Sequence, residues 1–246
     1  MKKYQIELER GKFYHIFNRG NNSERIFFSE RNYEFFLRRY NEYLSSYAET
    51  YAFCLLPNHF HFLIRVKAPA NPLHYANAKD FADNLSPNDP IAKALHLEDD
   101  TTNKKALHLE DDTTNKKALH LEDAKLLSSS PSNAFHRLFT SYSKAINLQQ
   151  NRHGSLFENP FKRIEITSDE YLKNLVIYIH TNPQLHGFVN NFKTYKWSSY
   201  KDIISNNPTI QYHPTVIKWF ENKGNFEFCH EQKIDFEIIK KFSFDE

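Results

Sequence analysis

Two strand-like runs joined by a short turn limit the folds open to this chain more than any other feature. Residues 51–56 and 59–66 are both rich in aromatic and aliphatic side chains, a composition typical of half-buried or buried β-strands. Between them lie Pro57 and Asn58, two residues that favour tight turns. The sequence therefore predicts a β-hairpin at this point.

The second run contains a histidine pair whose side chains share one face of the predicted strand. Successive strand residues point to opposite faces, so Phe60 and Phe62 are expected toward a core, and His59 and His61 toward the other side. The two imidazoles are then about 6.6 Å apart along the strand, at ~3.3 Å per residue. A divalent cation could bridge them, although a half-exposed strand face that tolerates two histidines is the ordinary alternative.

The remaining periodicities predict alternating strands and helices. They indicate a strand at 13–18, a helix capped by Ser29, a helix over 135–146, a strand at 162–166, and a helix from the capping box Thr167-x-x-Glu170 to Asn182-Pro183. The order is β-α-β-β-α-β-α, which matches the split βαβ, ferredoxin-like plan plus one helix. We therefore expect an α+β sandwich with helices packed on a mainly antiparallel sheet.

A tandem repeat interrupts this order. A 12-residue unit, KALHLEDDTTNK, recurs between residues 93 and 123, and its composition predicts a disordered, solvated insertion at about 86–130. The insertion would interrupt a domain formed by residues 1–205. Residues 206–246 are expected to form a helical C-terminal appendage.

Composition narrows the class of protein further. The chain is 40% hydrophobic and 15% aromatic, which suits a globular protein, and its net charge of +2 permits a nucleic-acid partner without requiring one. The cysteines, Cys54 and Cys229, lack zinc-type spacing and are expected as free thiols. No run of eighteen apolar residues and no signal-like start is found, so we expect a cytoplasmic protein without a membrane partner.

Six motifs in a fixed order resemble a known family. They are YHIFNRGNN at 14–22, LPNHFHFLI at 56–64, SYSKAIN at 141–147, GSLFENPFKRI at 154–164, YIHTNP at 178–183 and YKWSSY at 195–200. Together they resemble the HUH single-tyrosine transposases, and within them the REP-associated tyrosine transposases. The resemblance spans most of the chain outside the repeat.

This resemblance implies a metal-dependent enzyme that nicks single-stranded DNA at hairpin-forming sequences and transfers the strand. His59 and His61 would bind Mg²⁺ or Mn²⁺, and Tyr142 would be the nucleophile that forms a 5′-phosphotyrosine intermediate. A metal is chemically reasonable because a free tyrosine, with a pKa of about 10, is a poor nucleophile at neutral pH. Relatives act as dimers, so a homodimer is expected.

The nucleophile is not settled by the sequence alone. Tyr142 lies on the apolar stripe of its own predicted helix, where a tyrosine is usually a core residue. Tyr178 and Tyr195 are alternatives, although their segments look structural.

The third metal ligand is also open. Many relatives place a glutamine four residues after the tyrosine, but Ile146 stands at that position after Tyr142 and cannot coordinate a metal. Asn147, Gln149 or a water molecule would have to serve instead.

Three basic residues lie within the matching motifs and are expected to contact DNA phosphates, namely Arg19, Lys162 and Arg163. Two other functions remain in competition with the transposase. One is a non-catalytic or domesticated hairpin-DNA binding protein, and the other is a nicking endonuclease of the replication-initiator or relaxase type.

Overall fold

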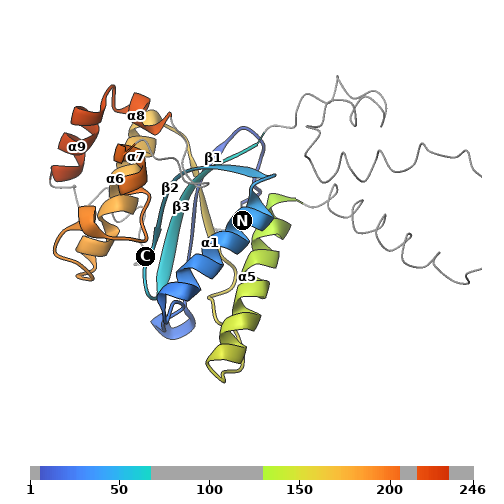
Figure 1. Cartoon of the computed structure of the whole chain (residues 1–246). Coiled ribbons are helices and arrows are strands. Elements are labelled where there is room, and N and C mark those ends of the chain that lie inside the picture. Colours follow the sequence, from blue (N-terminus) through green and yellow to red (C-terminus); the bar gives the residue numbers. More distant parts are fainter. Residues whose placement is uncertain (1–5, 68–129, 206–214, 233–246) are drawn as a thin grey trace, which may run out of the picture. The chain divides into compact units, whose positions relative to one another are not determined.

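The computed structural model describes residues 6–67, 130–205 and 215–232 (Figure 1). The elements along the chain are β1 (Phe13–Arg19), η1 (Asn21–Ser23), α1 (Glu30–Leu44), β2 (Ala48–Leu55), β3 (His59–Val66), α5 (Pro131–Gln149), β4 (Lys162–Ile166), α6 (Asp169–Leu185), η4 (Phe192–Thr194), α7 (Tyr200–Ser205), α8 (Val216–Trp219) and α9 (Lys223–Glu231). The expected β-α-β-β-α-β-α order is confirmed. The repeat insertion lies outside the described residues.

The four strands form one antiparallel sheet in the order β2-β3-β1-β4. The predicted hairpin is present, with β2 and β3 paired and Leu55 opposite Phe60. Strand β1 lies beside β3, so that Arg19 is the cross-strand neighbour of His59 and Phe17 that of His61. The centre of the sheet therefore places the histidine strand next to the N-terminal strand.

Helices cover both faces of this sheet (Figure 1). Helices α1 and α5 pack on one face around an aromatic core that includes Phe36, Phe60 and Phe62. Helix α6 covers the other face, where Leu63 and Leu175 belong to a second core. The α+β sandwich with an antiparallel sheet is confirmed, and within the described ranges no helix is long and apolar enough to cross a membrane.

Helix α6 differs from its predicted bounds at both ends. Its N-cap is Ser168, whose hydroxyl accepts a hydrogen bond from the Tyr171 N–H at 3.2 Å, rather than Thr167 one residue earlier. At the other end, the helix continues through Pro183 because the His186 N–H still donates to the Asn182 carbonyl at 3.0 Å. The helix therefore includes Asn182 instead of ending there.

The described helices of the C-terminal stretch pack on α6. Val216, Phe220 and Phe226 belong to the second core, and a buried histidine pair links α9 to α6. His180 Nδ1 lies 2.9 Å from His230 Nε2, while His230 Nδ1 donates to the Phe226 carbonyl at 2.7 Å. Two neutral rings satisfy this chain of hydrogen bonds, because each then needs only one proton.

We expect the protein to lose stability as the pH falls below about 6.5, the ordinary histidine value. Burial lowers the pKa of His230 to about 4 and that of His180 well below its usual value. As the pH falls, these histidines therefore bind protons in the unfolded chain before they do so in the folded chain, which favours unfolding. His15 and His59, with pKa values of about 3 and 4, act in the same direction. For His230 and His59, whose pKa values fall to about 4, the loss between pH 6.5 and 4 is on the order of 3 kcal/mol each.

Melting temperatures measured from pH 7.5 to 4.5 in a chelator test this expectation. His230→Phe, which replaces the ionisable ring among other aromatic rings, should lose less stability over the same interval than the wild type. A melting temperature that stays flat down to pH 4.5 contradicts the neutral histidine network.

Candidate active site

The two histidines of β3 lie on the α6 face of the sheet, as the alternation predicts. His61 is fully buried and His59 is 5% exposed, whereas Phe60 and Phe62 point into the α1 and α5 core. Their ring centroids are 5.3 Å apart. The histidines are therefore enclosed by protein rather than spread on an open strand face.

His59 contacts an amide oxygen at each ring nitrogen. Its Nδ1 lies 2.8 Å from Asn58 Oδ1, and its Nε2 lies 2.9 Å from Asn182 Oδ1 on α6. The Asn58 amide is oriented by its own Nδ2, which donates to the Ser23 carbonyl at 3.3 Å. Burial lowers the pKa of His59 to about 4, so the ring is neutral and has one N–H for two acceptors.

The contact between His59 Nε2 and Asn182 Oδ1 is therefore the one that a cation would favour. With the ring proton on Nδ1, both atoms present a lone pair, and Asn182 Nδ2 has no hydrogen-bond partner among the described residues. Two ligands at right angles around a metal with bonds of about 2.1 Å are about 3.0 Å apart. The observed separation of 2.9 Å suits such a pair.

His61 is oriented by a third histidine from the neighbouring strand. Its Nδ1 lies 2.9 Å from His15 Nε2, and the two rings stack at 5.1 Å. Burial, followed by the nearby imidazoles, lowers the pKa of His61 well below its usual value, so this ring is also neutral. A neutral, oriented imidazole is the form that binds a metal.

Helix α6 brings Tyr178 and Asn182 to this histidine pair. The two residues are four apart and so lie on the same face of the helix. The Tyr178 ring packs edge-on against His61 at 5.3 Å and also contacts His15 at 6.4 Å. Strand β3 and helix α6 thus place two imidazoles, one amide oxygen and one phenol in one location.

This donor set fits a divalent metal, although it is not made of the commonest ligands. The described residues contain no group of three or more His, Cys, Asp or Glu side chains suited to a metal. The available metal ligands are instead the two imidazoles of His59 and His61 and the amide oxygen of Asn182. Imidazole and carbonyl-type oxygens together suit Mn²⁺ and related first-row ions, and Mg²⁺ accepts such sites when water completes its shell.

The structure does not bring Tyr142 to the histidines. Tyr142 is fully buried in the α1 and α5 core on the opposite face of the sheet, where it packs edge-on against Phe36 at 5.0 Å. Its hydroxyl donates to the Ile26 carbonyl at 2.8 Å, and burial raises its pKa above the usual value. This geometry supports the core role of Tyr142 and not that of a nucleophile.

The two candidate third ligands on α5, Asn147 and Gln149, also lie away from the histidine pair. Asn147 Nδ2 donates to the Gly154 carbonyl at 2.8 Å, and Gln149 Oε1 accepts from Asn32 Nδ2 at 2.8 Å. Both are engaged on the α1 and α5 side, so neither reaches the His59 and His61 pair.

The three predicted DNA-contacting residues divide between the two faces. Arg19 is opposite His59 in the sheet and lies close enough for its charge to lower the pKa of His59. Lys162 pairs with Phe17 on the same face, and both cations form ion pairs with Glu158. Arg163 points to the other face, where it donates to Ser132 on α5 at 2.6 Å.

Tyr195, the other alternative nucleophile, is also accounted for by packing. Its hydroxyl donates to the Leu55 carbonyl at 2.8 Å, and burial raises its pKa above the usual value. It joins the loop after η4 to the end of β2. Its contacts are therefore those of a structural residue.

Sequence reasoning favoured neither Asn182 nor Tyr178 as a site residue, although a signal was present. The resemblance implies an oxygen-bearing side chain four residues after the tyrosine. Ile146 stands at that position after Tyr142, whereas Asn182 stands at that position after Tyr178 in the segment YIHTNP. Because Asn182-Pro183 is typical of a helix end, the sequence alone does not indicate that Tyr178 and Asn182 share one helix face. His15 was missed because its contact with His61 depends on the pairing of β1 with β3.

Comparison with known proteins supports this fold. No protein-family model and no curated protein matches the chain. Among solved structures, it is similar to a REP-associated tyrosine transposase bound to a REP hairpin, at 12% identity and a TM-score of 0.50. The match covers 87% of this chain and 92% of the other. The chain therefore shares the fold of a REP-associated tyrosine transposase.

Proposed function

We propose that the protein is a metal-dependent enzyme that nicks single-stranded DNA at hairpin-forming sequences and transfers the strand, with Tyr178 as its nucleophile. The observation that supports this most strongly is the meeting of His59 and His61 with Tyr178 and Asn182 at one site. The fold shared with a transposase bound to hairpin DNA points to the same class of substrate.

His59, His61 and Asn182 would hold Mg²⁺ or Mn²⁺. When bound, such an ion polarises the scissile phosphate and offsets its charge. The Tyr178 oxygen forms a bond to phosphorus and loses its proton, while the bond from phosphorus to the 3′ oxygen breaks and that oxygen gains a proton. The products are a 5′-phosphotyrosine and a free 3′-OH.

Burial of Tyr178 sets a condition on this step. Its side chain is 2% exposed, so the ring must become more accessible before it meets a phosphate. Catalytic contacts commonly tighten or rearrange only when substrate binds. We therefore expect the Tyr178 ring to move when DNA binds.

Arg19 and Lys162 are proposed to bind phosphates beside the site, and Arg163 is not, because it lies on the other face. Lys162→Ala should weaken single-stranded DNA binding and reduce the salt-dependence slope by about 0.7, the value for one phosphate contact. Arg163→Ala is the matched control and should leave the slope unchanged. Binding isotherms at several salt concentrations measure both, and equal slopes for the two variants contradict the assignment.

Covalent trapping tests the proposed function. Wild-type protein mixed with hairpin-containing single-stranded DNA and Mn²⁺ should form an adduct that survives denaturing electrophoresis. Tight binding without any adduct on such substrates supports the non-catalytic hairpin-DNA binding protein instead. An adduct that is never rejoined to a second strand supports a nicking endonuclease instead.

The homodimer also stays a proposal. Light scattering of the purified chain, alone and with hairpin DNA, measures its mass directly. A monomer in both conditions contradicts it.

A further inference from the structure

A fourth imidazole lies at the edge of the candidate site. His186 follows the last residue of α6, and its ring centroid is 4.9 Å from that of His59, with the planes at 72°. Unlike His59 and His61, it is exposed. It therefore lies between the enclosed histidine pair and the solvent from which DNA and metal arrive.

The position of His186 is set by the same turn of helix that presents Asn182. The two residues are four apart, and the His186 N–H donates to the Asn182 carbonyl at 3.0 Å. Side chains at this spacing share one helix face. The His186 ring is therefore on the side of α6 that carries Asn182, where it meets the His59 ring.

We propose that His186 is a further ligand of the metal at His59, His61 and Asn182, and that it makes this site prefer borderline first-row metals over Mg²⁺. The inference rests on the proposed function, since it needs the metal site. Three imidazoles and one amide oxygen are a nitrogen-rich set, which favours ions such as Co²⁺ and Zn²⁺, whereas Mg²⁺ prefers oxygen ligands.

A change of side-chain conformation completes the set. The described residues contain no preformed group of three or more His, Cys, Asp or Glu ligands, so the His186 ring must turn toward His59 when metal binds. His186 is exposed and belongs to neither hydrophobic core, so this turn leaves the packing of both cores in place. The ordinary alternative is a histidine that interacts only with the C-terminal end of α6.

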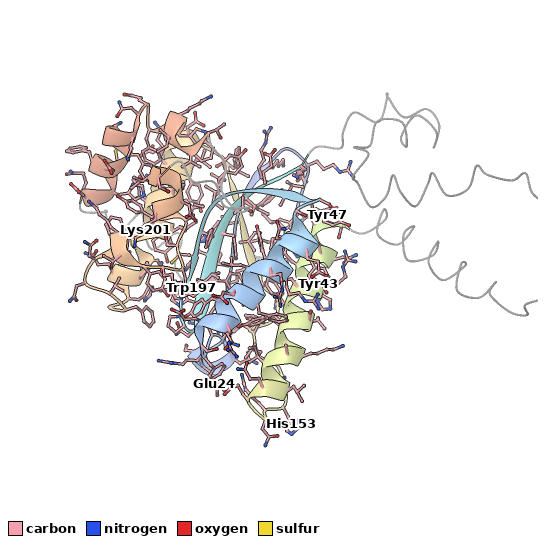
Figure 2. The ribbon with its side chains drawn as sticks, in the orientation of Figure 1. Glu24, Tyr43, Tyr47, His153, Trp197 and Lys201 are labelled. Atoms are coloured by element: carbon pink, nitrogen blue, oxygen red, sulfur yellow. The ribbon has the colours of Figure 1, made fainter. Side chains whose placement is uncertain are left out.

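Metal titrations of the full-length, metal-free chain at pH 7.5 distinguish these roles. Co²⁺ binding is followed by visible absorption and Mg²⁺ binding by calorimetry. His186→Ala should weaken Co²⁺ binding about 10-fold or more and change Mg²⁺ binding by less than about 3-fold. His153→Ala is the matched control, because His153 is also exposed but follows the far end of α5 (Figure 2).

His59→Ala separates this inference from the proposed function. If His59→Ala loses Co²⁺ binding while His186→Ala binds like the wild type, His186 is not a ligand and the inference is overturned, with the metal site intact. If His59→Ala itself binds Co²⁺ normally, the metal site of the proposed function fails as well. Equal losses in His186→Ala and His153→Ala also overturn the inference.

Discussion

Tyr178→Phe is expected to form no covalent adduct with hairpin-containing single-stranded DNA, under conditions where the wild type forms one. The change removes a single oxygen, so the ring still packs against His61 and the protein should fold and retard DNA in a native gel. Loss of the nucleophile should lower the rate of adduct formation by at least about 10³-fold. Denaturing electrophoresis with labelled DNA measures this.

Tyr142→Phe is the matched control on the other face of the sheet. It should keep adduct formation, because its hydroxyl is bonded to the Ile26 carbonyl inside the α1 and α5 core. The substitution should instead lower the free energy of unfolding by about 1–3 kcal/mol, because the buried Ile26 carbonyl is left without its donor. The reverse result, with adduct lost in Tyr142→Phe and kept in Tyr178→Phe, would restore Tyr142 as the nucleophile.

His59→Ala should reduce cleavage by about 10³-fold or more while DNA binding persists. The ring contributes Nε2, which faces Asn182 Oδ1 at 2.9 Å in the arrangement proposed to bind the metal, and metal polarisation of the phosphate is a large part of the rate. Single-turnover cleavage with Mn²⁺, beside native-gel binding, measures the two effects separately.

Three further variants show whether that loss is chemical. Asn182→Asp keeps an oxygen ligand and should retain much more cleavage than Asn182→Ala, which keeps none. His230→Ala removes a histidine of similar burial that contacts His180 in the second core, and it should cleave normally wherever it is folded. A large loss in His230→Ala at a temperature where it is folded points to a general effect of buried histidines.

The hairpin and the faces of its second strand were predictable because they depend on local chemistry. Pro57-Asn58 between two strand-like runs specifies the turn, and strict alternation separates Phe60 from His59 whatever the rest of the chain does. The same alternation could have separated Lys162 from Arg163. These neighbours in β4 point to opposite faces, although both lie in one motif.

The placement of each tyrosine relative to the histidines was not predictable in the same way, because it depends on which helix covers which face of the sheet. Tyr142 and Tyr178 both lie on apolar helix faces, and both are buried. Only the packing of α5 with α1, and of α6 with the histidine face, distinguishes them. The contact of His15 with His61 is likewise a result of strand pairing and has no local signal.

Peptide mapping of the wild-type adduct tests the central claim most directly. Cleavage after lysine and arginine places Tyr142, Tyr178 and Tyr195 in separate peptides, 138–144, 174–193 and 194–196, each with one tyrosine. After nuclease trimming, mass spectrometry should find the 5′-linked nucleotide on the peptide 174–193, at Tyr178. A nucleotide on the peptide 138–144 would contradict the assignment of the nucleophile to the histidine face of the sheet.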